Sequence, residues 1–137
     1  MKLILPLIVL IFFSCKKDNS TVGFRNKITG SWELEKNVCG ECITPVTNFP
    51  RGNGNIIILS ANGTYQRKKQ DTLLFSGNYT LQEKKDCFAR SSNYTFSTNE
   101  NPNPVSYGYI NLENDKLIFS TPNCFADGSV TTYRKIE

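Results

Sequence analysis

The stretch Ile28-Thr-Gly-Ser-Trp-Glu-Leu-Glu-Lys36 decides the fold, because its side chains alternate in character from one residue to the next. Ile28, Gly30, Trp32 and Leu34 fall on one side of an extended chain, and the polar or charged residues between them fall on the other. A period of two is the pattern of a half-buried β-strand. We therefore expect the folded domain to begin at Ile28 with a strand that has one face in a core.

Short segments of the same kind follow, and turn residues separate them. The Asn62-Gly63 pair is a strong hairpin signal. Eight strands with tight connections and no helix predict an all-β protein, which either packs as a sandwich or closes into a barrel without exposed edges. We favour the antiparallel up-and-down β-barrel of about eight strands. The predicted strands cover residues 28–36, 55–59, 64–70, 73–81, 87–97, 105–112, 116–120 and 129–136.

Composition limits the possible functions of the chain. Its 137 residues suffice for one domain, and histidine is absent, which excludes histidine-based acid–base catalysis, histidine-activated nucleophiles and histidine-containing metal sites. A net charge of +4 is too weak to indicate a nucleic-acid partner. We interpret Arg67-Lys68-Lys69 and Lys84-Lys85 as solvated strand faces and hairpin tips. A basic patch that faces anionic lipid or polysaccharide is the alternative.

The N-terminus carries an export signal. A positive start precedes an apolar run over residues 3–13, which is too short to span a bilayer. The ending Phe12-Phe13-Ser14-Cys15 resembles a bacterial lipobox, which implies acylation of Cys15. We expect a signal peptide over 1–14, an acylated cysteine with a polar tether over 15–27, and a barrel domain over 28–137. The product would be anchored to a membrane of the cell envelope, with the outer membrane favoured; a plain secretory peptide is the alternative.

The motif Gly30-Ser-Trp32 on the first strand resembles the lipocalin (calycin) superfamily, and more specifically the lipocalin-like domains of small bacterial lipoproteins. The stretches Asn62-Gly-Thr-Tyr65, 76–80 and 127–134 support this resemblance. It implies that Trp32 packs at the closed end of the barrel and that a basic residue of the last strand lies across its ring. Arg134, or alternatively Lys135, occupies a suitable position. Gly30, Trp32 and Arg134 are thus assigned to barrel closure.

Four cysteines remain after Cys15, an even number in an oxidising compartment, and we expect two structural disulfides. Cys39 or Cys42 would lie at the same barrel end as Cys124, which favours that bond, but Cys87 then stands at the far end and the pairing stays open. A redox pair at Cys39 and Cys42 would need a helix after it, and the chain there is irregular. A four-cysteine zinc site would need a second close pair.

Aromatic residues on the predicted inner faces are the ligand-binding candidates. They would either line an apolar pocket or fill the barrel as core. We expect no catalytic residues, no cofactor and no metal. The predicted function is non-catalytic binding of a small apolar ligand; the alternative is a filled barrel that binds envelope proteins or glycans through residues 37–54 and 99–104. The candidates are Tyr65, Phe75, Tyr79, Phe96, Tyr107 and Tyr109.

Overall fold

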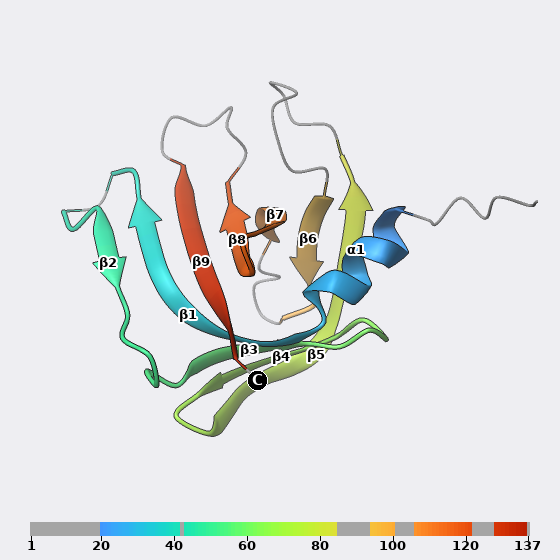
Figure 1. The fold of residues 1–137 in the computed structure, drawn as a ribbon, viewed down its shortest axis with the longest axis horizontal. Coiled ribbons are helices and arrows are strands. Elements are labelled where there is room, and N and C mark those ends of the chain that lie inside the picture. Colours follow the sequence, from blue (N-terminus) through green and yellow to red (C-terminus); the bar gives the residue numbers. More distant parts are fainter. Residues whose placement is uncertain (1–19, 42, 85–93, 101–105, 122–127, 137) are drawn as a thin grey trace, which may run out of the picture.

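The computed structural model describes residues 20–41, 43–84, 94–100, 106–121 and 128–136 (Figure 1). The described part is built almost entirely of antiparallel strands, which confirms the all-β prediction. Its elements are α1 (Ser20–Ile28), β1 (Gly30–Cys39), β2 (Val46–Asn48), β3 (Asn55–Leu59), β4 (Thr64–Lys69), β5 (Thr72–Glu83), β6 (Tyr94–Thr98), β7 (Ser106–Glu113), β8 (Lys116–Ser120) and β9 (Ser129–Ile136).

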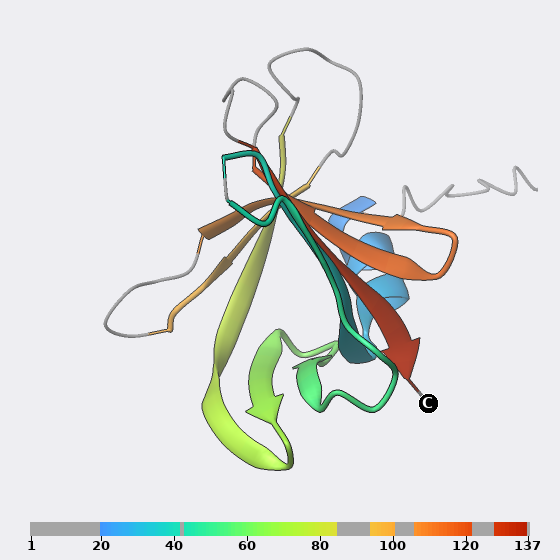
Figure 2. The same cartoon turned by 90° about the vertical axis from the view of Figure 1, so that its left-hand side faces the viewer.

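The sheet closes on itself, because β9 returns to pair with β1 along the whole stretch from Ser31 to Cys39. The ring β1-β3-β4-β5-β6-β7-β8-β9 is an eight-stranded up-and-down barrel, as predicted. The opposite edge of β1 is shared, since its first half pairs with β3 and its second half with β2. β2 is therefore an extra strand outside the ring, and Figure 2 shows how strongly the strands curve to complete it.

Turn chemistry explains the tight hairpins. Asn62 accepts a hydrogen bond from the Thr64 backbone N at 3.0 Å, and Gly63 takes a φ of 87°. The pair Asn114-Asp115 joins β7 to β8 with φ values of 50° and 58°. Two successive positive φ values give the turn a twist that matches the strands it connects.

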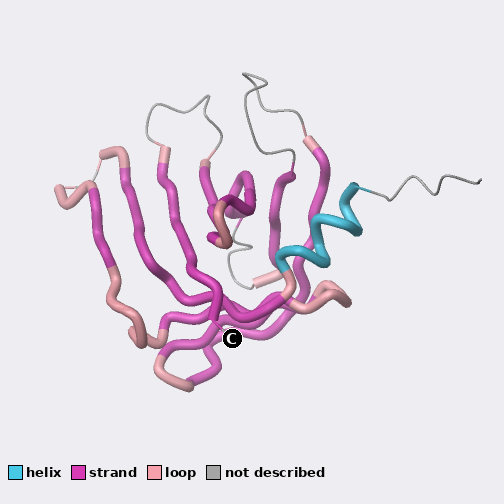
Figure 3. The backbone as a smooth tube through the Cα atoms, viewed as in Figure 1, coloured by secondary structure: helices cyan, strands magenta, loops and turns pink. Residues whose placement is uncertain are grey.

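The first helix corrects our prediction of a polar tether over residues 15–27. Residues 20–28 form α1, which lies beside β5 (Figure 3). Phe24 and Ile28 stand one helical turn apart, so they share a face of the helix. Ile28 is fully buried, and the Phe24 ring stacks on Tyr94 with centroids 4.2 Å apart. The folded unit thus includes α1 and begins before Ile28. No helix among the described residues is long and apolar enough to cross a membrane.

The barrel interior is filled by large side chains. Phe96 is fully buried, and its ring centroid lies 6.0 Å from that of Tyr65, 5.3 Å from Tyr79 and 5.1 Å from Phe119. Phe119 in turn lies 5.7 Å from Tyr133. Ring contacts at these separations stabilise a core beyond the area that they bury. The middle of the barrel is therefore a packed aromatic core.

Candidate functional site

The two ends of the barrel differ in the residues that form them. The α1 end contains α1, Trp32 and the turn at residues 60–63. Trp32 is 1% exposed and donates its indole N–H to the Ile28 carbonyl at 2.8 Å. Tyr79 donates its hydroxyl to the Ser60 carbonyl at 2.9 Å, and burial raises its pKa. The satisfied Trp32 and Tyr79 donors are typical of a structural closure, whereas Arg25 Nε in α1 is buried without a hydrogen-bond partner among the described residues.

The cation at Trp32 is Lys135, and this corrects our assignment of Arg134. Lys135 lies directly across from Trp32 in the β1–β9 register, with its Nζ 5.7 Å from the indole centroid. Successive residues of a strand point to opposite faces, so Arg134 lies on the outer face. Gly30, with a φ of 143°, lies beside this contact, since an added Cβ would stand 3.4 Å from Lys135 Cε. Gly30 and Trp32 occupy the positions expected for closure.

Arg134 holds the outer wall of the barrel together. Its guanidinium donates to the carbonyls of Phe49 and Leu34, and its Nε lies 3.6 Å from Glu33 Oε2. Glu33 is only 4% exposed, because the loop after β2 covers it and the Gly54 backbone N donates to it at 3.4 Å. A buried charge pair with these hydrogen bonds fixes that loop against β1.

The ligand-binding candidates are divided by the structure. Tyr65, Tyr79 and Phe96 belong to the packed core, and Phe75 packs against it. Tyr109 is buried but lies on the opposite face of β7 from the core residue Ile110. It lines an outer hollow of about 320 Å³ with its cross-strand neighbour Thr95 and with Gln82, so our expectation that it faces inward is wrong.

Several predicted residues fall outside the described part of the chain. The side chain of Tyr107 is one, and Cys15, Cys42, Cys87 and Cys124 are others. Cys39 is the last residue of β1 and pairs with Ser129. Lipidation and the two disulfides therefore stay predictions. Within the described ranges, no group of three or more acidic residues and cysteines is arranged to hold a metal ion.

A pocket of about 270 Å³ opens at the other end of the barrel, which we call the mouth. Its apolar wall is formed by inward residues of three strands and by an exposed leucine of β5. Cationic side chains of β4 complete its rim. The side chains that line it include Leu34, Ile57, Leu74, Tyr133, Arg67 and Lys69.

A buried polar cluster adjoins this mouth pocket. Arg67, which lines the pocket, forms an ion pair with Glu100, a residue that is only 8% exposed. Arg67 Nε, Glu100 Oε2 and Thr98 Oγ1 are buried and have no hydrogen-bond partner among the described residues. Buried polar atoms normally carry partners, and an unsatisfied one destabilises the protein by about 1–3 kcal/mol. The cluster is therefore equipped to bind water or the polar end of a ligand.

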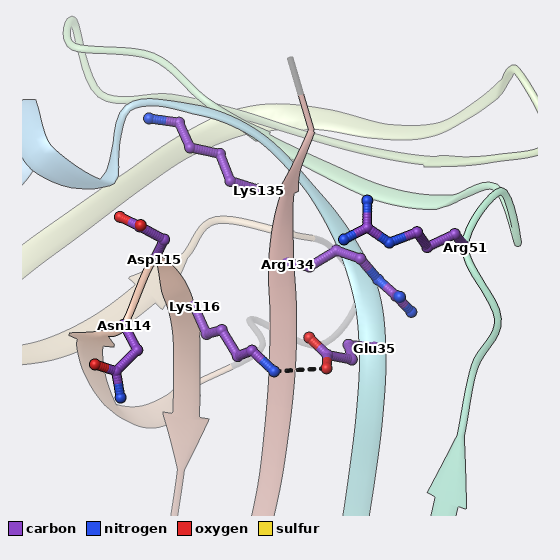
Figure 4. A pocket seen from close by; sticks show the side chains of 7 residues that line it. All are labelled: Glu35, Arg51, Asn114, Asp115, Lys116, Arg134 and Lys135. Carbon is purple, nitrogen blue, oxygen red and sulfur yellow. Dashed lines mark hydrogen bonds and ion pairs between the residues drawn. The ribbon is translucent and has the colours of Figure 1, made fainter.

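A second pocket, of about 250 Å³, lies on the outer wall between β1, β8 and β9 (Figure 4). Lys116 donates to Glu35 at 2.7 Å across its floor. This hydrogen bond lowers the pKa of the Glu35 carboxyl, partly opposed by burial, and Arg134 and Arg51 lower it further. Apart from this ion pair, the lining of the outer pocket is polar and charged, with Arg51, Arg134 and Lys135 beside Asp115. It therefore offers less to the apolar part of a ligand than the mouth does.

Comparison with known proteins adds no relative to this geometry. No protein-family model matches the chain, no curated protein matches it, and no solved structure matches it. The closed eight-stranded barrel is compatible with a lipocalin-like fold.

The mouth residues were missed at the level of sequence. We interpreted Arg67 as part of a solvated run, although it follows the core residue Tyr65 by two positions on the same strand. The period of two was therefore a usable signal. Glu100 gave no such signal, because it lies two residues beyond the end of β6 and outside any alternating run.

Proposed function

We propose that the protein is a lipid-anchored, non-catalytic binding protein of the bacterial envelope that holds a small amphipathic molecule in the mouth pocket. The observation that carries this proposal is the apolar pocket beside the unsatisfied cluster of Arg67, Glu100 and Thr98. The apolar body of the guest would lie against Leu34 and Leu74, and its polar end would reach the cluster.

Pocket size limits the guest. Ligand sites usually enclose roughly 300–1,000 Å³, and the mouth pocket has about 270 Å³. The aromatic core continues inward from Tyr133 through Phe119 to Phe96, so a guest has no deep cavity to enter. We therefore propose a small guest that is held at the entrance of the barrel.

Charge selects the polar end of the guest. The rim carries Arg67, Lys68 and Lys69, and Glu100 neutralises one of them. Arginine and lysine only donate hydrogen bonds, so the complementary group is rich in acceptors, and a carboxylate or a phosphate ester fits. In this proposal Cys15 would supply the lipid anchor.

Native mass spectrometry of the exported protein, purified gently from its own bacterium, tests the proposal. We expect an extra mass that disappears on denaturation. Leu74→Trp fills the pocket and should abolish this mass. Leu73→Trp is the matched control, because Leu73 is equally exposed and does not line the pocket. A clean apo mass for the wild-type protein, or a guest that survives Leu74→Trp, would overturn the proposal.

A second candidate function rests on β2. All three of its residues are exposed, and within the described chain it pairs only with β1, so it is an open sheet edge. Exposed edges bind extended peptides by strand addition. This supports the alternative of an interaction module for envelope proteins. A photo-crosslinker at Val46 in intact cells should then capture one defined partner, whereas no adduct would favour the mouth pocket alone.

A further inference from the structure

The tip of the β4–β5 hairpin, residues 68–74, exposes two adjacent leucines. Arg67 pairs with Phe75 and Lys68 pairs with Leu73, so Leu74 is an extra residue in a β-bulge. In a regular strand one of two successive side chains would turn to the other face. Here the bulge leaves Leu73 and Leu74 exposed at 51% and 53%. Bulges re-aim side chains and are commonly functional.

Positive charge surrounds these leucines. Lys68 and Lys69 precede them, and Asp71 is the single acidic residue of the tip. The Gln70 backbone N donates to the Gly54 carbonyl at 3.0 Å, which ties the tip to the loop that carries the exposed Arg51. The hairpin projects from the body of the barrel, as Figure 2 shows. The tip is thus a convex apolar edge flanked by cations.

We propose that this tip docks on an anionic lipid bilayer, with Leu73 and Leu74 in the interface and Lys68 and Lys69 against the lipid phosphates. Apolar side chains next to lysine and arginine are the composition that binds anionic membrane surfaces. Charge complementarity selects the lipid: the tip carries two lysines against one aspartate. A protein partner would need a concave face to receive the tip. Binding of the tip to lipid vesicles without any other protein distinguishes the two occupants.

This contact does not depend on the proposed ligand. It would also hold the mouth at the membrane, because Leu74 and Lys69 belong both to the tip and to the wall of the mouth pocket. A guest of lipid origin would then enter the pocket from the bilayer.

Fluorescence of Leu73→Trp in the full chain, reconstituted on vesicles, tests the docking. Vesicles of phosphatidylcholine are compared with vesicles that also contain phosphatidylglycerol, and both kinds carry the same fraction of brominated acyl chains. We expect a blue-shifted emission and quenching by bromine only on the anionic vesicles, weakened by salt. The native Trp32 is buried and contributes the same background to every variant.

Val46→Trp is the matched control, since Val46 is also an exposed strand residue at 44% and lies away from the tip on β2. The variant Lys68→Gln/Lys69→Gln should shift the equilibrium between docked and free tip about 30-fold toward the free state, from roughly fivefold per cation. The proposal is overturned if Leu73→Trp is quenched no more than Val46→Trp, or if the lysine variant leaves the quenching unchanged. Circular dichroism checks that each variant keeps its fold.

Discussion

The α1 end and the mouth of the barrel are built on opposite principles. At the α1 end, the Phe24 ring stacks on Tyr94, Lys135 lies over Trp32, and the Trp32 and Tyr79 donors are satisfied. At the mouth, the buried Glu100 and the partly exposed Arg67 carry polar atoms that lack partners among the described residues. The first arrangement stabilises the fold, and the unsatisfied atoms of the second reduce its stability. The contrast places stability at the α1 end, opposite the end at which we propose binding.

The largest effect should come from the α1 end. Trp32→Ala removes a fully buried indole together with its hydrogen bond to Ile28. Large-to-small changes of this kind destabilise proteins by about 3–5 kcal/mol. Urea unfolding followed by circular dichroism measures the change. The comparison of the two ends fails if Leu74→Ala at the mouth destabilises the protein as much as Trp32→Ala.

A second prediction concerns the border between the core and the mouth. The bulge of β5 lies at Leu74, and Gly77 has another role. A Cβ on Gly77 would stand 2.6 Å from Phe75 Cζ and would also clash with the Asn99 side chain. Gly77→Ala should therefore destabilise the protein by about 1–3 kcal/mol.

Phe75→Leu gives the control for this clash. The double variant Gly77→Ala/Phe75→Leu should recover part of the loss, because a smaller side chain can leave the space over residue 77. Thermal unfolding of the four proteins of this cycle gives the coupling. Strictly additive losses would show that the Phe75 ring does not set the requirement for glycine.

The mouth itself should respond to loss of its ion pair. Arg67→Met leaves the Glu100 carboxylate buried without its cation. Removal of one partner of a fully buried pair costs about 3–5 kcal/mol, but Arg67 is 42% exposed, so we expect about 1–2 kcal/mol. The double variant Arg67→Met/Glu100→Leu should lie close to wild type in chemical denaturation. A double variant less stable than Arg67→Met would assign the cluster to the structural framework.

Alternation along the strands predicts much of the core and little of the site. Trp32, Tyr65 and Phe96 stand at inward positions of clearly alternating segments, and the structure buries all three. The same rule leaves a choice of face in β7. There the cross-strand contacts of Ile110 with Phe119 and of Leu112 with Leu117 decide which side faces inward, and Tyr109 is left outside. The period of two gives the spacing, whereas neighbouring strands select the face.

Contacts between distant residues account for the other differences. The α1 helix offers only Phe24 and Ile28 as a buried face, and it is held there by Tyr94, seventy residues later in the chain. Arg134 and Lys135 are adjacent basic residues, and only the register of β9 on β1 decides which one meets Trp32. These contacts are determined by the pairing of segments that lie far apart in the chain, and the local sequence pattern does not predict that pairing.

The smallest predicted effect belongs to the outer wall, which links the two ends. Lys116 lowers the pKa of Glu35 below its ordinary value near 4.5. A carboxylate whose pKa is lowered by folding stabilises the folded state at pH values above its ordinary pKa. This stabilisation is lost as the pH falls through the lowered pKa.

Since the pair is partly solvated, Lys116→Gln should reduce the free energy of unfolding by about 0.2–1 kcal/mol at pH 7. The loss should vanish at acidic pH, where Glu35 is neutral in both proteins, and shrink in high salt. Lys36→Gln is the control, because Lys36 is an exposed lysine of β1 with no ion pair in the described chain. The test is the free energy of unfolding of the wild-type protein and of both variants, measured from pH 7 down to acidic pH. A loss that persists at acidic pH would mean that Lys116 acts through packing and not through its charge.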